Sequence, residues 1–374
     1  MPAAPPPSAR DVLGVPLPPA PAVNAVLRMR GRLARLGPAV PPQVAVIERS
    51  FGVLDSAALA VLVEVGVPDA LERDRSTADE LAERLDCDPD ALHRLLRYAA
   101  SRGFLRLDRR GRFRANGVTR VLRSDHPTSL AAWVRCFGSD WYLPIWGRAE
   151  HSIRTGRSAT EAVTGHDFFE FVQQVRPDAG AHFDAAMADG ARLLGLLLAE
   201  ALDWSGVQRI CDVGGGTGRH LADILARAPA LTGVLVDLPE VVGRAGPVLA
   251  GAGVDDRVDV VGGDFFGSVP TGCDCYLLVA VVHDWDDDRA ARILANVRDA
   301  LPPGGRVLVV ENRLHDDEVW ELSKASDLMM LVLTGAGRER TRDSMTALAQ
   351  RGGLQVTAVT ALANGFDVTE MTAP

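Results

Sequence analysis

The chain has 374 residues, 47% of them hydrophobic and 24% charged, which excludes a disordered chain, a fibrous protein and a small scaffold held by disulfides. At roughly 100–200 residues per domain, this length predicts two domains. The net charge of −9 argues against a protein that grips phosphate backbones. The sequence has neither an apolar run of membrane-spanning length nor the charged-then-apolar start of a signal peptide. We therefore expect a cytoplasmic protein that binds neither nucleic acid nor membranes.

The five cysteines are odd in number and form no Cys-x-x-Cys pair. This pattern argues against a disulfide framework and against a four-thiolate zinc site. We expect reduced and mostly buried thiols at Cys87, Cys136, Cys211, Cys273 and Cys275.

The first segment in chain order, residues 1–22, is rich in proline and is expected to be an extended arm. The stretch 43–70 is apolar on most faces, which is typical of a helix buried between other helices or between subunits. Residues 76–99 then predict two short helices separated by a turn, and residues 104–114 predict a strand-turn-strand hairpin. This order is that of a winged helix-turn-helix.

Two interpretations of the winged helix are open. Its arginines could contact DNA phosphates, or the fold could pair two subunits with the arginines solvated. The acidic balance of the whole chain favours pairing. The arginines concerned are Arg94, Arg97, Arg102, Arg109, Arg110 and Arg112.

A helical stretch with many aromatic residues connects this region to a different pattern that begins at Val207. Short apolar runs rich in Val, Ile and Leu alternate there with helical lengths, which predicts a mostly parallel sheet covered on both faces. The five runs are VQRICDV, LTGVLVD, RVDVVGG, CYLLVAVV and RVLVVEN. Ligands of such sheets bind at the carboxyl ends of the strands, so chemistry is expected there.

Acidic residues end three successive strands of this predicted sheet. Asp212 precedes a glycine-rich turn that opens a helix, but Arg219 stands where a dinucleotide fingerprint requires its third glycine. A carboxylate there favours a cationic ligand. Asp237 is placed to accept hydrogen bonds from the hydroxyls of a ribose. Asp264 is placed to accept a hydrogen bond from the amino group of an adenine, with Phe265 packed against the adenine ring. The three acids together favour S-adenosylmethionine over a dinucleotide.

A histidine follows the fourth strand, at the same predicted edge. We expect the fourth strand to end at His283, which is then placed to act as a general base beside the cofactor. Glu311 ends the fifth strand and Glu339 follows the next helix, so both could orient the imidazole. From the residues alone, an ion pair of Glu339 with Arg338 or Arg340 on a surface loop is equally compatible.

Taken together, these motifs resemble those of the class I, S-adenosylmethionine-dependent small-molecule O-methyltransferases, the group of plant caffeate-type enzymes and bacterial enzymes that tailor aromatic polyketides. The resemblance covers nearly everything after the proline-rich segment. It rests on DVGGGTG (212–218), VDLPEVV (236–242), GDFF (263–266), HDWDDD (283–288), LPPGGRVLVVE (301–311) and GRERT (337–341).

The resemblance implies a fold and roles for particular residues. The fold is α/β: a Rossmann-like class I methyltransferase domain over 201–374, with a mostly helical winged-helix dimerisation domain over 23–125 and a helical linker over 126–200 that lines the substrate pocket. The catalytic residues are His283, Glu311 and Glu339. The cofactor-binding residues are Asp212, Gly214, Gly215, Gly216, Asp237, Leu238, Asp264, Phe265 and Trp285, and the substrate-binding residues are Phe183, Met187, Asp327, Met330 and Trp141. Core packing is the alternative for Met330.

We therefore expect a homodimeric enzyme that methylates a hydroxyl, most simply a phenolic one, of a small aromatic molecule and releases S-adenosylhomocysteine. His283 would take the hydroxyl proton, and no metal is expected, because no His/Asp cluster has ligand spacing. Val279 stands four residues before His283, where many relatives carry Lys or Ser, so one cofactor contact is lost or replaced. The alternatives are a cofactor-binding relative that does not methylate, a nitrogen or carbon acceptor, and a ligand-responsive DNA-binding regulator.

Overall fold

The computed structural model describes residues 18–34, 41–71 and 75–374. Within these residues it divides into two compact units. The helical unit comprises the described residues within 37–150 together with 160–190, and the sheet unit comprises those within 1–36 together with 151–159 and 191–374. Residues 1–17 of the expected proline-rich arm lie outside the described residues. The domain bounds expected from the sequence stay predictions.

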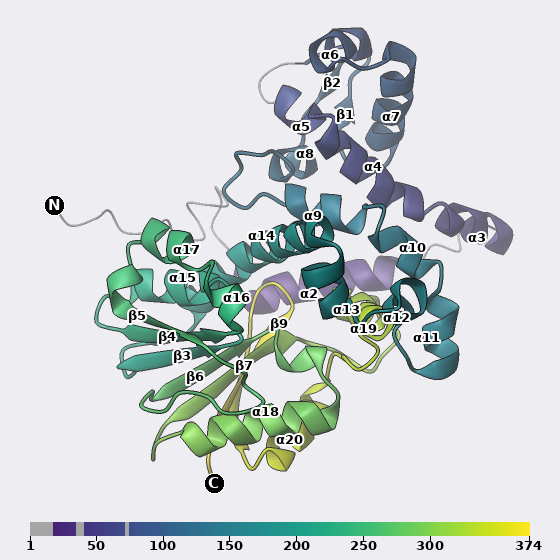
Figure 1. Ribbon diagram of the computed structural model, residues 1–374. Helices are drawn as coiled ribbons and strands as arrows, with labels where there is room; N and C mark the ends of the chain where they lie inside the picture. Colours follow the sequence, from purple (N-terminus) through teal and green to yellow (C-terminus); the bar gives the residue numbers. More distant parts are fainter. Residues whose placement is uncertain (1–17, 35–40, 72–74) are drawn as a thin grey trace. The chain divides into compact units, whose positions relative to one another are not determined.

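The elements before residue 177 are mostly short helices (Figure 1). They are α2 (Ala20–Ala34), α3 (Pro42–Ser50), α4 (Val53–Glu64), α5 (Val67–Ala70), α6 (Ala78–Leu85), α7 (Pro89–Ser101), β1 (Arg106–Leu107), β2 (Phe113–Arg114), α8 (Gly117–Val121), α9 (Ala131–Phe137), α10 (Tyr142–Trp146), α11 (Ala149–Thr155), α12 (Ala159–Thr164), α13 (Phe168–Glu170) and the π-helix η2 (Phe171–Val175).

From residue 177 onward, strands and helices alternate after one long helix. The elements are α14 (Pro177–Ala201), β3 (Arg209–Val213), α15 (Arg219–Arg227), β4 (Thr232–Asp237), α16 (Pro239–Val242), α17 (Gly246–Gly251), η3 (Asp255–Arg257), β5 (Val258–Gly262), β6 (Cys275–Val279), η4 (Val282–Asp284), α18 (Asp287–Ala300), β7 (Arg306–Asn312), α19 (Leu322–Leu333), α20 (Arg342–Arg351), β8 (Gln355–Ala361) and β9 (Phe366–Thr372). No helix in the described part of the chain is long and apolar enough to cross a membrane.

The two helices and the hairpin of the winged helix form where the sequence predicts them. α6 begins after Thr77, which exchanges side-chain to backbone hydrogen bonds with Glu80 in a capping box. α7 begins after Asp88, whose carboxylate accepts from a backbone N–H of the first turn. β1 and β2 pair antiparallel, and Phe113 of β2 lies in the core of the unit with 1% of its surface exposed.

The apolar stretch 43–70 forms three helices, and the expectation of a single helix is wrong. α3 and α4 are separated after Ser50, and Gly66 separates α4 from α5 with a φ of 82°, a left-handed conformation that favours glycine. Many large apolar side chains of this stretch are exposed in the single chain: Val44, Val46, Ile47, Phe51, Val53, Leu54 and Val61. Exposed apolar surface of this extent is typical of an interaction site.

The sheet has the strand order β5-β4-β3-β6-β7-β9-β8. The first five strands in this order are parallel, which confirms the predicted mostly parallel sheet. β9 pairs antiparallel with β7, and β8 with β9; these two strands were not predicted. The chain runs from β3 toward β5 and then returns to β6 beside β3, so the strand order reverses between β3 and β6. In open α/β sheets, the crevice at such a point binds ligands.

Helices cover both faces of the sheet, with α15 and α17 along one face and α18 and α20 along the other (Figure 1). Alternate strand residues supply the two cores. Ile210 packs in the core that contains Leu221 of α15, whereas Cys211 packs in the core that contains Ile293 of α18. All five cysteines are free thiols, and all but Cys87 are buried.

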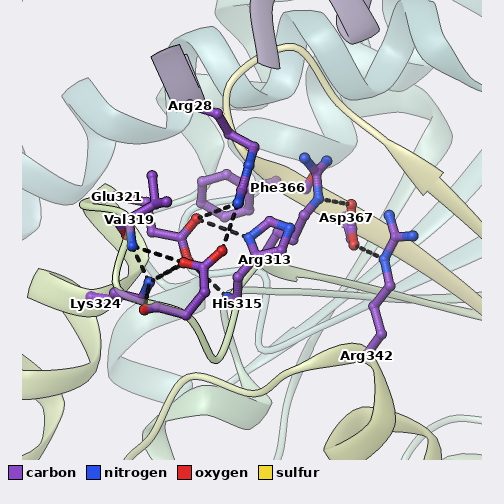
Figure 2. Close-up of polar contacts among 10 residues, drawn as sticks. Arg28, Arg313, His315, Val319, Glu321, Lys324, Arg342, Phe366 and Asp367 are labelled. Carbon is purple, nitrogen blue, oxygen red and sulfur yellow. Dashed lines mark hydrogen bonds and ion pairs between the residues drawn. The ribbon is translucent and has the colours of Figure 1, made fainter. Parts of the chain in front are cut away.

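Charged side chains attach α2 to the loop that precedes α19 (Figure 2). Arg28 Nη2 of α2 lies 2.6 Å from Asp317 Oδ2, and its Nη1 lies 3.9 Å from Glu321 Oε2. The same two acids contact Lys324 Nζ at 2.8 Å and His315 Nδ1 at 2.9 Å, respectively. The start of α19 is therefore held by a network of five charged or polar side chains.

Candidate active site

A glycine-rich turn follows β3 at the reversal of strand order. Gly214, Gly216 and Gly218 have φ angles of 70°, 60° and 81°, which glycine adopts without steric cost. A Cβ atom at Gly214 would lie 2.9 Å from the side chain of Val281, just beyond β6. α15 begins at Arg219, as predicted. The turn therefore brings glycine backbone, which has no side chain, close to the C-terminal end of β6.

Asp212 of β3 lies beneath this turn and is fully buried. A Cβ atom at Gly215 would lie 2.5 Å from Asp212 Oδ2. Neither carboxylate oxygen has a hydrogen-bond partner among the described residues. Burial and the charge of Asp237 raise the pKa of Asp212 to about 7, against a smaller opposing effect of the Leu221 N–H. Such a carboxylate fits a cationic or hydrogen-bond-donating ligand.

Asp237 ends β4 on the same side of the sheet. Its Oδ2 accepts from the N–H of Gly216 at 2.8 Å, and its Oδ1 accepts from the N–H of Leu238 at 2.7 Å. Burial raises the pKa of Asp237, and these two hydrogen bonds oppose the rise. Each oxygen keeps a lone pair for a further donor, such as a ligand hydroxyl. Leu238 beside it is exposed.

The loop after β5 carries Asp264, which is exposed, and a group of aromatic rings. The N–H of Phe266 donates to Asp264 Oδ1 at 2.8 Å. The ring of Phe265 lies 6.1 Å from that of Trp285, and the ring of Phe266 lies 4.7 Å from Trp285. Two predicted cofactor-binding residues, Phe265 and Trp285, are thus brought together although they are 20 positions apart in the sequence.

The chain turns sharply between β6 and His283. β6 ends at Val279, so the expectation that the fourth strand extends to His283 is wrong: Ala280 has a φ of 53°, and His283 lies in the short helix η4. Glu311 Oε1 accepts from the backbone N–H groups of Val281, Val282 and His283 at 3.2, 2.9 and 3.4 Å. Glu311 therefore holds the turn that carries the histidine.

The GRERT segment fixes this turn from its other side. The N–H of Arg338 donates to the carbonyl of His283 at 2.7 Å. Arg340, with a side chain that is 2% exposed, donates to the carbonyls of Val282 and Trp285 at 2.8 and 2.9 Å. Sequence reasoning weighed Arg340 only as an ion-pair partner of Glu339. The position of Arg340 within the GRERT motif (337–341) was the signal that could have identified this structural role.

Three carboxylates surround the imidazole of His283. Its Nδ1 lies 3.2 Å from Glu339 Oε1 and 3.5 Å from Glu311 Oε2, and its Nε2 lies 3.6 Å from Asp284 Oδ1. Burial alone would lower the pKa of His283, but Glu311, Asp284 and Glu339 outweigh burial and raise it well above the ordinary value. His283 is therefore a stronger base than an isolated imidazole.

The two glutamates beside His283 differ in electrostatic state. Burial raises the pKa of Glu311 to about 7. Burial would also raise the pKa of Glu339, but hydrogen bonds from His283, Ser326 and Asn312 bring it below its ordinary value. Glu339 is thus the anion at neutral pH, paired with His283 and not with an arginine.

His283, Glu311 and Glu339 each place one nitrogen or oxygen within 4.8 Å of the others. The structure brings together the three residues that the sequence predicted to act together, although they come from η4, β7 and the loop after α19. Their atoms are arranged for proton exchange with one imidazole. The expectation of metal-free chemistry stays a prediction.

The predicted substrate residues belong to both units. Trp141, Phe183 and Met187 lie in the helical unit, where the ring of Trp141 is buried and Phe183 is half-buried. Asp327 and Met330 lie on α19 of the sheet unit. Asp327 Oδ1 accepts from the N–H of Glu339 at 2.9 Å, which places it directly beside the acid–base group. Met330 is buried, with 7% of its surface exposed.

Comparisons with known proteins decide the family. Residues 146–355 match the model of an O-methyltransferase domain, and residues 47–125 match that of an O-methyltransferase dimerisation domain. The chain belongs to the O-methyltransferase family. The match to the dimerisation domain covers the winged helix, which places this O-methyltransferase among those with a dedicated pairing domain.

Similar proteins support the same assignment. The chain is 39% identical over 314 residues to O-demethylpuromycin-O-methyltransferase of Streptomyces alboniger, covering 83% of each protein. It is 38% identical to 3-amino-4-hydroxybenzoate 4-O-methyltransferase of Streptomyces cremeus, covering 84% of this chain and 86% of that protein. The solved methyltransferase of calicheamicin biosynthesis, with S-adenosylhomocysteine bound, has a TM-score of 0.81 at 31% identity, covering 89% of this chain and 98% of that one. The protein is an S-adenosylmethionine-dependent O-methyltransferase of small molecules.

One relative has a name that is not that of a methyltransferase. Aclacinomycin 10-hydroxylase RdmB of Streptomyces purpurascens is 36% identical over 327 residues, covering 84% of this chain and 87% of that protein. Similarity to this relative alone therefore does not separate the two named activities.

Proposed function

We propose that this O-methyltransferase methylates a phenolic hydroxyl of a small aromatic natural product, with His283 as the general base. The observation that carries the proposal is the set of contacts to Nδ1 of His283, which lies 3.2 Å from Glu339 and 3.5 Å from Glu311. A proton on Nδ1 leaves the lone pair of Nε2 for the acceptor hydroxyl. The named substrates of the relatives, which include a hydroxybenzoate, support the aromatic class.

S-adenosylmethionine supplies the methyl group, which the hydroxyl oxygen takes as the carbon–sulfur bond breaks and S-adenosylhomocysteine is left. The proton of the hydroxyl moves to Nε2 of His283 as negative charge develops on the oxygen. Glu339 and Glu311 stabilise the imidazolium that results. General-base assistance of this kind typically contributes about 10²–10⁴-fold to the rate.

The residues at the strand ends fit S-adenosylmethionine. Asp212 has two buried oxygens without a partner in the described chain, which suits the cationic end of the cofactor. Asp237 has lone pairs for two ribose hydroxyls, and Asp264, Phe265 and Trp285 would hold the adenine. Gly214, Gly215 and Gly216 would let the backbone approach the cofactor, with Leu238 beside the ribose.

We propose that Trp141, Phe183, Met187, Asp327 and Met330 bind the aromatic acceptor. Aromatic and thioether groups suit a flat apolar substrate. Trp141 belongs to an aromatic cluster, with its ring 5.8 Å from that of Tyr142 and 6.2 Å from that of Phe171. Replacement of these residues is expected to raise KM for the acceptor and to leave cofactor affinity unchanged.

The direct test is label transfer from methyl-labelled S-adenosylmethionine to a panel of matched aromatic compounds. Each phenol is paired with its aryl methyl ether, which has no proton to lose, and with the corresponding aniline. Label on the phenol alone supports the proposal. Label on the aniline would assign nitrogen transfer, and a hydroxylated product without label would assign the chemistry named for the hydroxylase relative.

We also propose that two copies pair through the winged-helix region. The exposed apolar residues Val46, Ile47 and Phe51 lie in or beside α3, and all three side chains are more than half exposed in the single chain. Light scattering should give twice the chain mass for the native protein. Ile47→Asp should shift it toward the monomer, whereas Ile153→Asp, equally exposed on the sheet unit, should not. Equal masses for both variants would contradict this interface.

The DNA-binding alternative has less support from the arginines themselves. Arg94 contacts Asp90 at 2.8 Å, Arg112 contacts Glu80 at 3.1 Å, and Arg102 forms a paired contact with Asp55. Arginines that are already paired with acids offer less charge to phosphates. A gel shift with generic DNA that weakens steeply with salt would revive this alternative. A cytoplasmic location stays a prediction.

A further inference from the structure

Glu339 is the point at which three hydrogen bonds meet. Its Oε1 accepts from Nδ1 of His283 at 3.2 Å, from Nδ2 of Asn312 at 2.7 Å and from Oγ of Ser326 at 2.6 Å. The Glu339 side chain is 0% exposed. Asn312 ends β7 and Ser326 lies on α19, so two separate elements supply these donors.

The donors determine where protons lie in this cluster. The amide Nδ2 of Asn312 only donates, so Oε1 of Glu339 carries no proton while that bond exists. Nδ1 of His283 must then be the protonated nitrogen, because it faces an unprotonated oxygen. In the neutral ring, Nε2 is left as the acceptor, since its nearest carboxylate oxygen, Asp284 Oδ1, is more distant at 3.6 Å. A proton on Glu339 would remove the reason for this tautomer.

Glu311 offers a contrast in the same cluster. Its Oε1 accepts only from backbone N–H groups, and its Oε2, like that of Glu339, has no hydrogen-bond partner in the described chain. No side chain donates a hydrogen bond to it among the described residues. The extra donors are therefore specific to Glu339.

Building on the proposed role of His283 as the base, we infer that Asn312 and Ser326 are positioning residues: they keep Glu339 ionised and thereby hold His283 in the Nδ1–H tautomer that accepts the substrate proton at Nε2. Nothing in the acceptor or cofactor chemistry requires contact with either residue. Both act through Glu339.

Other charged groups face the same atoms and set the background for pH measurements. Asp284 of η4 and Glu311 of β7 face His283. The charges of Asp327 on α19, and of Arg338 and Arg340 in the loop that carries Glu339, act on Glu339 or on its neighbours. These groups are unchanged in Asn312 and Ser326 variants, so a difference in pH dependence reports on the two donors.

The variants are Asn312→Leu, Ser326→Ala and their combination. Without the two donors, a buried Glu339 takes up a proton more readily, and His283 loses its anionic partner. We expect kcat of the double variant to fall about 10- to 100-fold, with KM for S-adenosylmethionine within about twofold of the native value. The acidic limb of the kcat/KM profile should move to lower pH, because the pKa of His283 falls.

Two further variants separate positioning from folding. Ser326→Thr keeps the hydroxyl that Ser326→Ala removes, so it should restore the native kcat and pH profile relative to Ser326→Ala. Ser323→Ala, one turn earlier on α19, removes a buried hydroxyl that has no partner in the described chain and should change neither. An unchanged pH profile in the double variant would overturn the inference, as would failure of Ser326→Thr to restore it.

A measurement without turnover keeps this test distinct from that of the proposed function. Nitrogen NMR of ¹⁵N-histidine-labelled protein identifies the ring of His283 by its absence in His283→Gln. Above the pKa of His283, the native spectrum should show the proton on Nδ1, and the double variant should lose that preference and titrate at lower pH. An identical ring spectrum in both proteins refutes the role of Asn312 and Ser326. Full turnover by His283→Gln refutes the base itself.

Discussion

The two halves of the ligand-binding edge of the sheet use carboxylates in opposite ways. After β4 and β5, Asp237 and Asp264 accept hydrogen bonds from backbone N–H groups; Asp237 is half-buried and Asp264 is exposed. Beside β6 and β7, Glu311 and Glu339 are buried around the single imidazole of His283. In the proposed mechanism, the same side-chain chemistry therefore serves cofactor binding on one half and proton transfer on the other, and the surroundings of each carboxylate decide which.

Asp212 lies between these extremes. It belongs to the cofactor half by its place on β3, but it is as buried as the glutamates, and its pKa is raised to about 7. The backbone N–H of Leu221 opposes this rise in pKa but does not cancel it. We predict that variants beside β6 and β7 lower turnover and keep cofactor affinity, whereas variants after β4 and β5 lower cofactor affinity and keep turnover.

The largest difference in kcat is expected beside His283, between the variants Glu339→Gln and Glu311→Gln. Glutamine at 339 cannot supply the negative charge that His283 faces, so kcat should fall about 10²-fold or more. Glutamine at 311 keeps an oxygen for the three backbone N–H groups, so the loss should be about tenfold smaller. Steady-state kinetics at saturating cofactor measure both. Equal losses would mean that the two acids are interchangeable.

The pH dependence of the native enzyme tests the same half. In the proposed mechanism the neutral imidazole of His283 is the active base, so kcat/KM should rise with pH through the pKa of His283. The neighbouring carboxylates raise that pKa, so the midpoint of the acidic limb should lie above the ordinary histidine value of 6.5. A midpoint at or below 6.5 would contradict the electrostatics of the cluster.

On the cofactor half, Asp237→Asn should weaken S-adenosylmethionine binding about 10- to 100-fold, because charge-assisted hydrogen bonds to hydroxyls become neutral ones. At saturating cofactor, kcat should stay within about threefold of the native value. Asp259→Asn, an exposed residue paired with Arg209, is the control and should leave binding unchanged. Calorimetry measures the affinity, and a native value for Asp237→Asn would remove its role.

The smallest effect is expected from metal removal. His283, Glu311 and Glu339 lie close together, but the mechanism assigns them to a proton. Incubation with a strong chelator followed by desalting should leave kcat unchanged. Activity that disappears and returns with one divalent cation would reassign the cluster.

Much of the sheet is predictable from the sequence, for a physical reason. β3, β4, β6 and β7 are mostly buried apolar runs because both of their faces are covered, and such runs are visible without a structure. β5 at the edge of the sheet is mostly exposed, and it was predicted from its valines. β8 and β9 escaped prediction: the burial of β8 alternates between partial and exposed, so its seven residues carry no apolar run. Their antiparallel pairing depends on contacts that form only in the folded chain.

The site shows a similar limit. The acids at strand ends follow from the strand pattern, since parallel strands deliver their carboxyl ends to one edge. The turn that places His283 depends on the positive φ of Ala280, and alanine gives no sign of a positive φ in the sequence. Asn312 and Ser326 lie 27 and 13 positions from Glu339, with no spacing rule to link them. Such partners become visible only in three dimensions.

In the proposed mechanism, His283 serves methyl transfer and not cofactor binding. Two measurements on His283→Gln test this role most directly: the affinity for S-adenosylmethionine by calorimetry and the rate of label transfer to a phenol. His315→Gln, whose histidine pairs with Glu321 near α2, is the matched control. We predict native cofactor affinity for both variants and a loss of about 10²–10⁴-fold in transfer for His283→Gln alone. Native transfer by His283→Gln, or a loss of cofactor affinity that accounts for its slow transfer, would contradict the account.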